Sequence, residues 1–116
     1  MPAVSPITTH VLDTSCGRPA AGVAIVISIW QDEQWHKLGA GFTSKDGRVT
    51  DLLPCDQPLA PGRYQMRFET SAYFEACHVQ GFYPYVEVVF EITVVDQHYH
   101  VPLLLNPFGY STYRGS

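Results

Sequence analysis

The chain has 116 residues, of which 46% are hydrophobic and 16% are charged, so it can build one folded core and is not typical of a disordered protein. Its formal net charge of -4 and its few, scattered basic residues give no electrostatic case for binding nucleic acid. No apolar run is long enough to span a bilayer, so neither nucleic acid nor a membrane is expected as a partner.

Short apolar runs separated by Gly, Pro and Asp predict a single all-β domain over residues 1–116. The first strand is expected at residues 7–13 (ITTHVLD). A second strand is expected at residues 23–30 (VAIVISIW), where every second side chain is apolar and faces one side. A polar turn, QDEQ, then leads to a third strand at residues 35–43 (WHKLGAGFT).

The SKDGR segment predicts a tight turn, because the glycine of Asp46-Gly47 accepts a positive φ at no steric cost. A short strand, VTDLL, follows at residues 49–53. Residues 60–70 (APGRYQMRFET) are interpreted as a turn and a strand. The side chains expected to point into the core from this strand are Tyr64, Met66 and Phe68.

One segment, residues 71–80 (SAYFEACHVQ), predicts a short helix, because Ser71 is a favourable N-cap and the following GFYP ends it. The last strands are expected at residues 86–94 (VEVVFEITV), in HYHVPLLL and in YSTYR. About eight strands with one short helix make a two-sheet β-sandwich.

Two histidines near the end, His98 and His100, lie two residues apart in an expected strand, so both point to the same face. His10 lies in the middle of the first strand, opposite in phase to Ile7 and Val11. All three imidazoles are therefore expected to face outward from neighbouring strands. Arg48 directly follows the Asp-Gly turn, where a long cation can reach across the sheet.

These four residues allow three interpretations. His10, His98 and His100 can form a zinc site, since two histidines two apart on a strand plus a third make a plausible triad. Alternatively, neutral imidazoles take a proton from water without a metal while Arg48 holds an anionic substrate or a developing oxyanion. The third interpretation is a solvated polar strand face. His36 and His78 are interpreted as ordinary surface residues.

The three cysteines, Cys16, Cys55 and Cys77, are odd in number and form no CxxC pair, which argues against a disulfide framework. The start, MPAVSPITTH, lacks the basic and apolar regions of a secretory signal. We therefore expect the protein in the cytoplasm, unless a leader has been removed.

Three motifs carry a family resemblance: TTHVLD near the start, DGR after the first hairpins, and HVPLLLNPFGYSTYRGS at the end. From Ile7 to Ser116 the chain resembles the 5-hydroxyisourate hydrolases, the transthyretin-like enzymes of purine catabolism. The terminal YRGS is specific to the enzymes, because the hormone carrier transthyretin lacks it and has lysine where His10 lies. Asn106 stands where many relatives have serine.

The resemblance implies a transthyretin-type sandwich assembled as a homotetramer, a dimer of dimers, with sites in the channel where the dimers face each other. It implies ring opening of 5-hydroxyisourate by water attack on a ring carbonyl, with no metal and no cofactor. It assigns the following residues: His10, Arg48, His100 and Ser116 to catalysis, His10, Arg48 and Tyr113 to substrate binding, and His98, Arg114 and Gly115 to support. The alternatives are a transthyretin-like carrier of a small hydrophobic ligand, and a zinc-dependent cyclic amide hydrolase.

Overall fold

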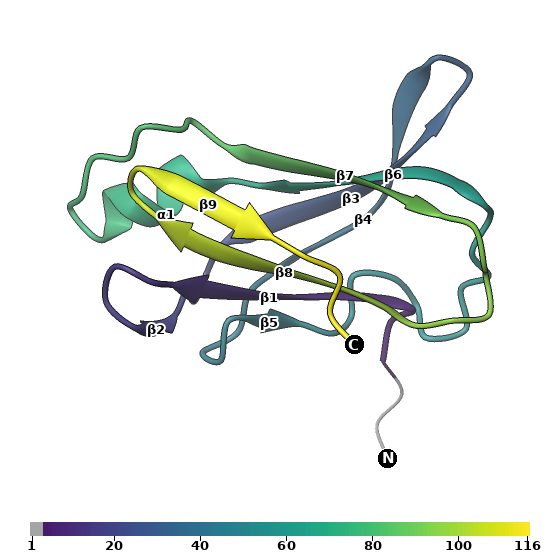
Figure 1. The fold of residues 1–116 in the computed structure, drawn as a ribbon, viewed down its shortest axis with the longest axis horizontal. Coiled ribbons are helices and arrows are strands. Elements are labelled where there is room, and N and C mark those ends of the chain that lie inside the picture. The colour runs from purple at the N-terminus through teal and green to yellow at the C-terminus, as the bar shows by residue number, and fades with distance from the viewer. Residues whose placement is uncertain (1–3) are drawn as a thin grey trace.

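The computed structural model describes residues 4–116, which fold into two β-sheets packed face to face with one short helix at one end (Figure 1). The five-stranded sheet contains β1 (Ile7–Asp13), β2 (Arg18–Pro19), β5 (Arg48–Val49), β8 (Tyr99–Asn106) and β9 (Gly109–Thr112). The four-stranded sheet contains β3 (Ala24–Gln31), β4 (Gln34–Phe42), β6 (Gly62–Phe68) and β7 (Val86–Ile92). The predicted two-sheet sandwich is confirmed, and the two-residue β2 raises the described strands to nine.

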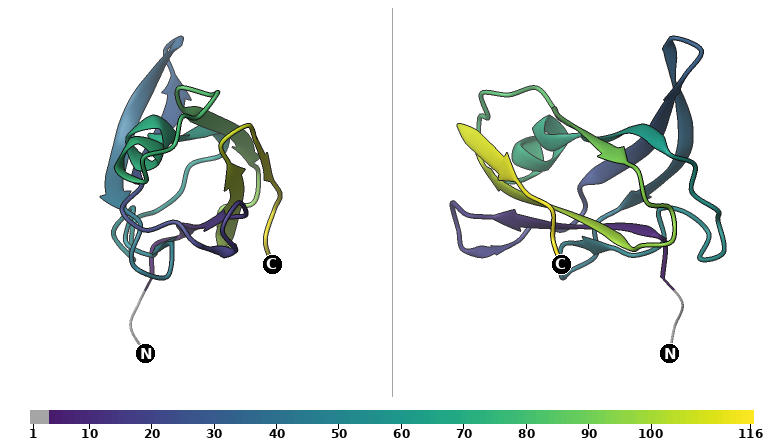
Figure 2. Two further views of the ribbon diagram at one scale, coloured as in Figure 1. Left: turned by 90° about the vertical axis from the view of Figure 1, so that its left-hand side faces the viewer. Right: turned by 45° about the vertical axis from the view of Figure 1, so that its right-hand side comes forward.

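The strand order brings the two ends of the chain together. In the first sheet the order is β2-β1-β8-β9, with β5 also paired to β1, and in the second it is β4-β3-β6-β7. The pair of β1 with β8 is parallel, and every other strand pair described is antiparallel. The first and last long strands therefore lie side by side, as the two further views also show (Figure 2).

The core lies between the sheets and follows the predicted alternation of side chains. Val23, Ile25, Ile27 and Ile29 are all buried, as are Tyr64, Met66 and Phe68 on β6. From the other sheet, Ile7, Val11, Leu103 and Leu105 pack against them. Burying each such side chain contributes about 1.5–3 kcal/mol to folding, so these alternating faces account for the sandwich.

The helix α1 (Thr70–Ala76) corrects the predicted range of residues 71–80 at both ends. Its N-cap is Glu69, which makes no side-chain capping bond, rather than Ser71. It ends at Ala76, with Cys77 as its C-cap, because His78 takes a left-handed conformation, with φ of 59°. Tertiary contacts hold it in place: Phe74 is buried in the core, and the Tyr73 hydroxyl donates a 2.7 Å hydrogen bond to Asp13 of β1.

The strand expected at residues 49–53 is shorter than predicted and begins one residue earlier. Only Arg48 and Val49 pair with β1, while Leu52 and Leu53 bury their side chains from a bend. Arg48 is therefore part of a strand rather than of the turn before it. This shift fixes the direction of its side chain relative to β1.

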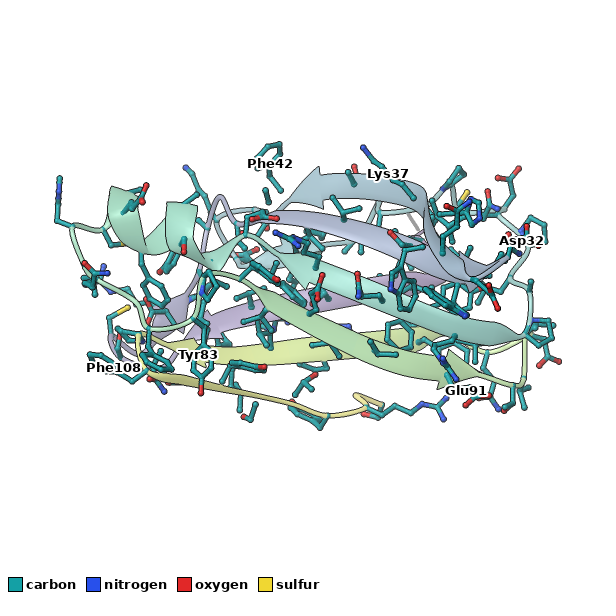
Figure 3. All side chains as sticks on the ribbon, turned by 90° about the horizontal axis from the view of Figure 1, so that it is seen from above. Asp32, Lys37, Phe42, Tyr83, Glu91 and Phe108 are labelled. Atoms are coloured by element: carbon teal, nitrogen blue, oxygen red, sulfur yellow. The ribbon has the colours of Figure 1, made fainter. Side chains whose placement is uncertain are left out.

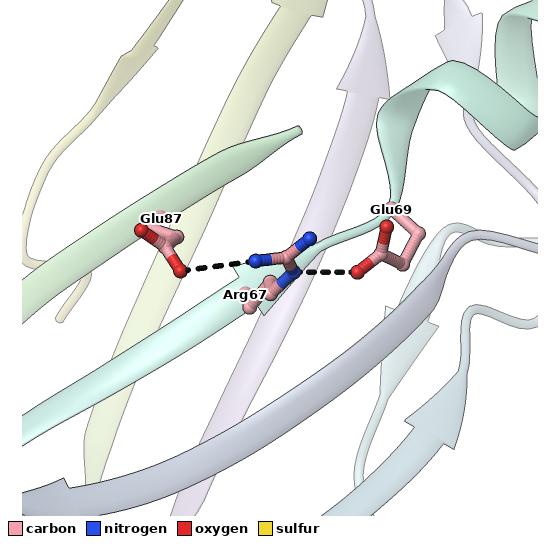
Figure 4. A network of polar contacts seen from close by, with 3 residues as sticks. All are labelled: Arg67, Glu69 and Glu87. Atoms are coloured by element: carbon pink, nitrogen blue, oxygen red, sulfur yellow. Dashed lines mark hydrogen bonds and ion pairs between the residues drawn. The ribbon is translucent and has the colours of Figure 1, made fainter. Parts of the chain in front are cut away.

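The four-stranded sheet carries a small cluster of charged side chains on its outer face. Arg67 contacts Glu69 at 2.6 Å and Glu87 at 3.3 Å (Figure 4). Its guanidinium also lies 3.7 Å from the centre of the Tyr85 ring. Such exposed pairs contribute at most about 1 kcal/mol each.

The two ends of the sandwich differ in their exposed side chains. Tyr83 and Phe108 lie at one end, and Asp32, in the β3–β4 turn, lies at the other (Figure 3). Among residues 4–116 there is no helix with the length and apolar character needed to cross a membrane.

Candidate active site

The candidate site lies on three neighbouring strands of the five-stranded sheet, β5, β1 and β8 (Figure 1). His10 of β1 lies directly opposite Arg48 of β5, and Thr8 of β1 lies directly opposite His100 of β8. Side chains directly opposite each other in an antiparallel pair have Cβ atoms about 4.5–5.5 Å apart. Residues that are far apart in the sequence thus form one polar group on the outer face of this sheet.

The placement of Arg48 depends on the turn before it. Gly47 has φ of +75° and lies so close to β1 that a Cβ atom there would overlap the carbonyl oxygen of Val11. The backbone N–H of Val11 donates a 2.7 Å hydrogen bond to the carbonyl of Gly47. Glycine therefore serves two needs at this position, the left-handed conformation and the close approach of the two backbones.

Thr8 lies between two of the histidines. Its Oγ1 is 2.9 Å from Nε2 of His98 and 2.8 Å from Nδ1 of His100. His98 directly precedes β8 and is exposed, whereas His100 is half-buried. The sequence reasoning did not select Thr8, although it shares the outward face with His10; only the pairing of β1 with β8 reveals its role.

His10 is held by the turn that also places Arg48. Its Nε2 lies 2.8 Å from the backbone carbonyl oxygen of Asp46. A carbonyl only accepts, so this nitrogen carries the proton and donates it. Neutral His10 therefore has its lone pair on Nδ1.

A concavity of about 340 Å³ opens among these residues. We call it the histidine hollow, and its lining residues are Val4, Thr8, Thr9, Arg48, Thr50, His98, His100 and Ser116. His10 is not part of the lining but lies beside it, opposite Arg48. The structure thus brings Arg48, His98, His100 and Ser116 together at one concavity.

Tyr113 and Arg114 line a different concavity, of about 320 Å³, which we call the edge hollow. Its other lining residues are Val88, Val89, Phe90, Glu91, Tyr99, His100, Val101 and Thr112. Only His100 lines both hollows. In the single chain, therefore, Tyr113 is not on the same side of His100 as Arg48 and Ser116.

The end of the chain is held rather than free. After β9 the pairing with β8 is interrupted at Tyr113 and Arg114; the register places Tyr113 opposite Pro102, which has no N–H to donate. It resumes where the Gly115 N–H donates a 2.8 Å hydrogen bond to the carbonyl of His100.

The side chain of Arg114 reinforces this attachment. Its Nη2 donates a 2.8 Å hydrogen bond to Gln97, and the guanidinium lies 4.6 Å from the centre of the Tyr99 ring. Both partners lie in or directly before β8. These contacts place Ser116, the last residue, at the histidine hollow.

The charges around His100 favour its neutral form. Burial lowers the pKa of the His100 imidazole below its usual 6.5, and the positive charges of Arg48, His98 and His10 lower it further. Within residues 4–116 both ion pairs involve Arg67, so the Arg48 guanidinium has no carboxylate partner there. The site therefore combines a neutral imidazole with a cation available to a ligand.

The three imidazoles do not converge on a common point. Nitrogens of His98 and His100 bond to Thr8, and a nitrogen of His10 bonds to the backbone of Asp46. In the part of the chain that the structure describes, no group of three or more His, Cys, Asp or Glu side chains is arranged to hold a metal ion. His36, whose Nε2 bonds to the Gln31 carbonyl, and His78 lie on other elements.

The fold and this polar face define a transthyretin-type sandwich with histidines on its outer sheet surface. The chain belongs to the HIUase/Transthyretin family, whose sequence profile matches residues 7–115. It is 54% identical over 110 residues to a probable 5-hydroxyisourate hydrolase of Caenorhabditis elegans, an alignment that covers 95% of this chain and 81% of the relative.

Two solved structures show the same fold. The 5-hydroxyisourate hydrolase of Klebsiella pneumoniae matches with a TM-score of 0.83 and 35% identity, over 95% of this chain and 97% of that one. Sea bream transthyretin in complex with thyroxine matches with a TM-score of 0.89 and 32% identity, over 95% of this chain and 94% of that one. Because a hydrolase and a transthyretin that binds thyroxine both match well, the backbone does not distinguish the two activities, and the site must do so.

Proposed function

We propose that this protein hydrolyses 5-hydroxyisourate, opening its ring to 2-oxo-4-hydroxy-4-carboxy-5-ureidoimidazoline during urate degradation. The observation that carries the proposal is the histidine hollow, where Arg48, His100 and Ser116 meet beside His10. Similarity to the hydrolases of Caenorhabditis elegans and Klebsiella pneumoniae supports the same reaction.

Arg48 is proposed to bind the substrate. 5-Hydroxyisourate is planar, rich in carbonyl groups and easily anionic, and a planar guanidinium matches such an anion with two parallel hydrogen bonds. No carboxylate among residues 4–116 competes for Arg48. The same cation stabilises the negative charge that develops on the carbonyl oxygen when water attacks.

His100 is proposed as the general base. Its Nδ1 is engaged by Thr8, so Nε2 is the nitrogen that can meet a water molecule in the hollow. The lowered pKa keeps the imidazole neutral near pH 7, as a base requires. His10 helps to position the water from beside Arg48, and a base of this kind is typically worth about 10²–10⁴-fold in rate.

The chain end and Tyr113 complete the proposed site. Ser116 lines the histidine hollow, so its polar groups are available near the reacting atoms. Tyr113 lines the edge hollow instead, so its contact with substrate rests on the family resemblance alone.

The alternative function is that of a carrier, as in the sea bream protein that binds thyroxine. A site for a hydrophobic ligand is lined mainly by apolar side chains with few polar groups. The histidine hollow has Val4 as its one apolar lining residue, and Arg48 leaves a cation facing the ligand. This polar lining favours hydrolysis over carriage.

We also propose a homotetramer in the cytoplasm. The histidine hollow opens on an outer sheet face, and a facing dimer would enclose it from water. In the single chain β4, β7 and β9 are edge strands available for pairing with another copy. The three free, exposed cysteines suit a reducing compartment.

The direct test is spectroscopic. 5-Hydroxyisourate is generated from urate in the cuvette, and its decay is followed with and without the protein. We expect faster decay, unchanged by excess chelator, because no group of three or more His, Cys, Asp or Glu side chains among residues 4–116 is arranged to hold a metal ion. No acceleration would overturn the proposal, while activity lost on chelation and restored by zinc would favour the zinc-dependent alternative.

A further inference from the structure

We propose that Thr8 is a positioning residue whose hydroxyl joins His98 to His100 in a proton relay and sets which nitrogen of His100 is free to act as a base. This inference deepens the proposed hydrolysis and rests on it. It gives His98 a defined task, where sequence reasoning gave it only support. It begins from the two short contacts that Thr8 makes, 2.9 Å to His98 and 2.8 Å to His100.

The hydroxyl of Thr8 has a single proton and must serve two nitrogens. It can donate to only one of them, so the other imidazole must donate its own N–H to Oγ1. If both imidazoles donated, the hydroxyl proton would need another acceptor, but Thr8 is only 5% exposed and makes no other side-chain hydrogen bond within residues 4–116. One N–H therefore points at Oγ1, and the tautomers of the two histidines are coupled.

This coupling leaves two arrangements of the neutral pair. In the first arrangement, Nε2–H of His98 donates to the Thr8 hydroxyl, and the hydroxyl donates to Nδ1 of His100. The proton of the neutral His100 ring then lies on Nε2, so this nitrogen has no lone pair with which to act as a base. In the second, Nδ1–H of His100 donates to Thr8, which donates to Nε2 of His98. Only the second leaves Nε2 of His100 able to take a proton from water.

The relay then moves charge away from Arg48. Water adds its oxygen to the ring carbonyl carbon, and its proton goes to Nε2 of His100. As the Nδ1 proton of His100 passes to Thr8, the hydroxyl proton passes to Nε2 of His98. The positive charge thus leaves half-buried His100, which lies near the Arg48 cation, for exposed His98, where water solvates it.

The second half of the reaction returns the relay to its start. His100, now protonated on Nε2, donates that proton to the ring nitrogen released when the C–N bond breaks. The proton on Nε2 of His98 goes back to Thr8, whose own proton returns to Nδ1 of His100. The proton taken from water thus ends on the leaving nitrogen, with no net change in the protein.

Two substitutions separate this role from packing. Thr8→Val keeps the shape and the β-branch but removes the hydroxyl, while Thr8→Ser keeps the hydroxyl. We expect Thr8→Val to lower kcat by about 10- to 100-fold, the usual effect of losing an orienting partner, with KM changed far less. Thr8→Ser should recover most of kcat, and equal melting temperatures would show that the fold is intact.

A double-mutant cycle tests the link to His98. If Thr8 and His98 act as one relay, His98→Ala should lower kcat about as much as Thr8→Val, and the double variant should lose little more. Losses that multiply, or a Thr8→Val protein with the kcat of the parent, would overturn the relay.

A third measurement needs no substrate. Long-range ¹H–¹⁵N spectra of the imidazole rings, recorded at about pH 8, well above the ordinary imidazole pKa of about 6.5, report which nitrogen carries each proton. We expect one of the two nitrogens that contact Thr8, Nε2 of His98 and Nδ1 of His100, to carry a proton and the other to be bare. In Thr8→Val the protonation of one nitrogen should no longer depend on that of the other. Both nitrogens protonated, or both bare, would overturn the inference. Failure of the unaltered protein to hasten substrate decay would instead refute the hydrolysis, so the two failures are distinguishable.

Discussion

Gly115 lies against the imidazole of His100. The backbone N–H of Gly115 donates a 2.8 Å hydrogen bond to the carbonyl of His100, and a Cβ atom at Gly115 would lie only 2.6 Å from Cδ2 of that ring. The chain end thus forms one wall against the proposed base. Any side chain at this position must displace the ring, the terminal segment or both.

Gly115→Ala is therefore expected to reduce activity by at least about tenfold, because a displacement of about 1 Å at a catalytic group can cost 100-fold. The melting temperature should change little, since the residue lies at the chain end outside the core. Gly109→Ala is the matched control in the same hairpin, because its Cβ would meet Asn106 at an ordinary 3.7 Å. Steady-state kinetics on both variants decides, and equal activities would mean that the contact is unimportant.

Replacing His100 by alanine should lower turnover by about 10²–10⁴-fold, as expected for a lost general base. His10→Ala and Arg48→Ala should also lower turnover by orders of magnitude, because they remove a water-positioning group and the cation that stabilises the oxyanion. None of the three should change the melting temperature much. All three lie on the outer sheet face rather than in the core. His36→Ala and His78→Asn serve as controls, the latter because asparagine tolerates the left-handed backbone at φ of 59°. A control as damaging as His100→Ala would show that histidines outside the hollow matter.

The sandwich could be predicted from the sequence because its strands are amphipathic with a period of two. Val23 to Ile29 and Tyr64 to Phe68 alternate, and burial follows that alternation in the structure. The range of α1 could not be predicted, since its cap residue makes no side-chain bond and tertiary contacts of Phe74 and Tyr73 hold it. β2 escaped notice because two residues carry no periodic pattern.

The candidate site, like the fold, could be predicted only in part. The outward direction of His10 and of His100 follows from the spacing within single strands. The contact of Thr8 with both His98 and His100 depends on the parallel pairing of β1 with β8, which joins residues about ninety positions apart. The position of Tyr113 at the edge hollow likewise depends on how the terminal segment pairs with β8. Such facts arise from pairing between strands, which no local pattern encodes.

The pH dependence of kcat/KM should report the lowered pKa of His100. The base must be neutral, so activity should fall on the acidic side with a midpoint below 6.5. Arg48 is one of the cations that lower this pKa, so Arg48→Gln should move the midpoint upward, even though overall activity falls. An NMR titration of His100 in both proteins measures the shift directly, and a midpoint that stays in place would exclude the electrostatic coupling.

Stability should depend on pH through the same residue. Between the folded pKa and the usual 6.5, the unfolded chain binds more protons at His100 than the folded protein does. The contribution of His100 is therefore fully present above 6.5 and is lost as the pH falls through the folded pKa. Replacing His100 by asparagine should flatten the pH dependence of the melting temperature in this window, and an unchanged dependence would assign it to other groups.

The last residue should tolerate no extension. Ser116 lines the histidine hollow, and the segment before it is fixed by the hydrogen bond of Gly115 and by the contacts of Arg114 with Gln97 and Tyr99. Residues added after Ser116 must therefore enter the hollow or pull the segment from β8. We expect a C-terminal tag to abolish most activity, whereas the same tag placed before Met1 should be tolerated.

Deleting residues 113–116 should also abolish activity but leave a folded protein, because β9 ends at Thr112 and the buried core ends at Leu105. Light scattering on all versions would show whether the expected tetramer persists, and so whether activity is lost at the site or through dissociation. If the C-terminally tagged protein kept full activity, the terminal YRGS would be an ordinary tail, and neither Ser116 nor Gly115 could form a wall of the site.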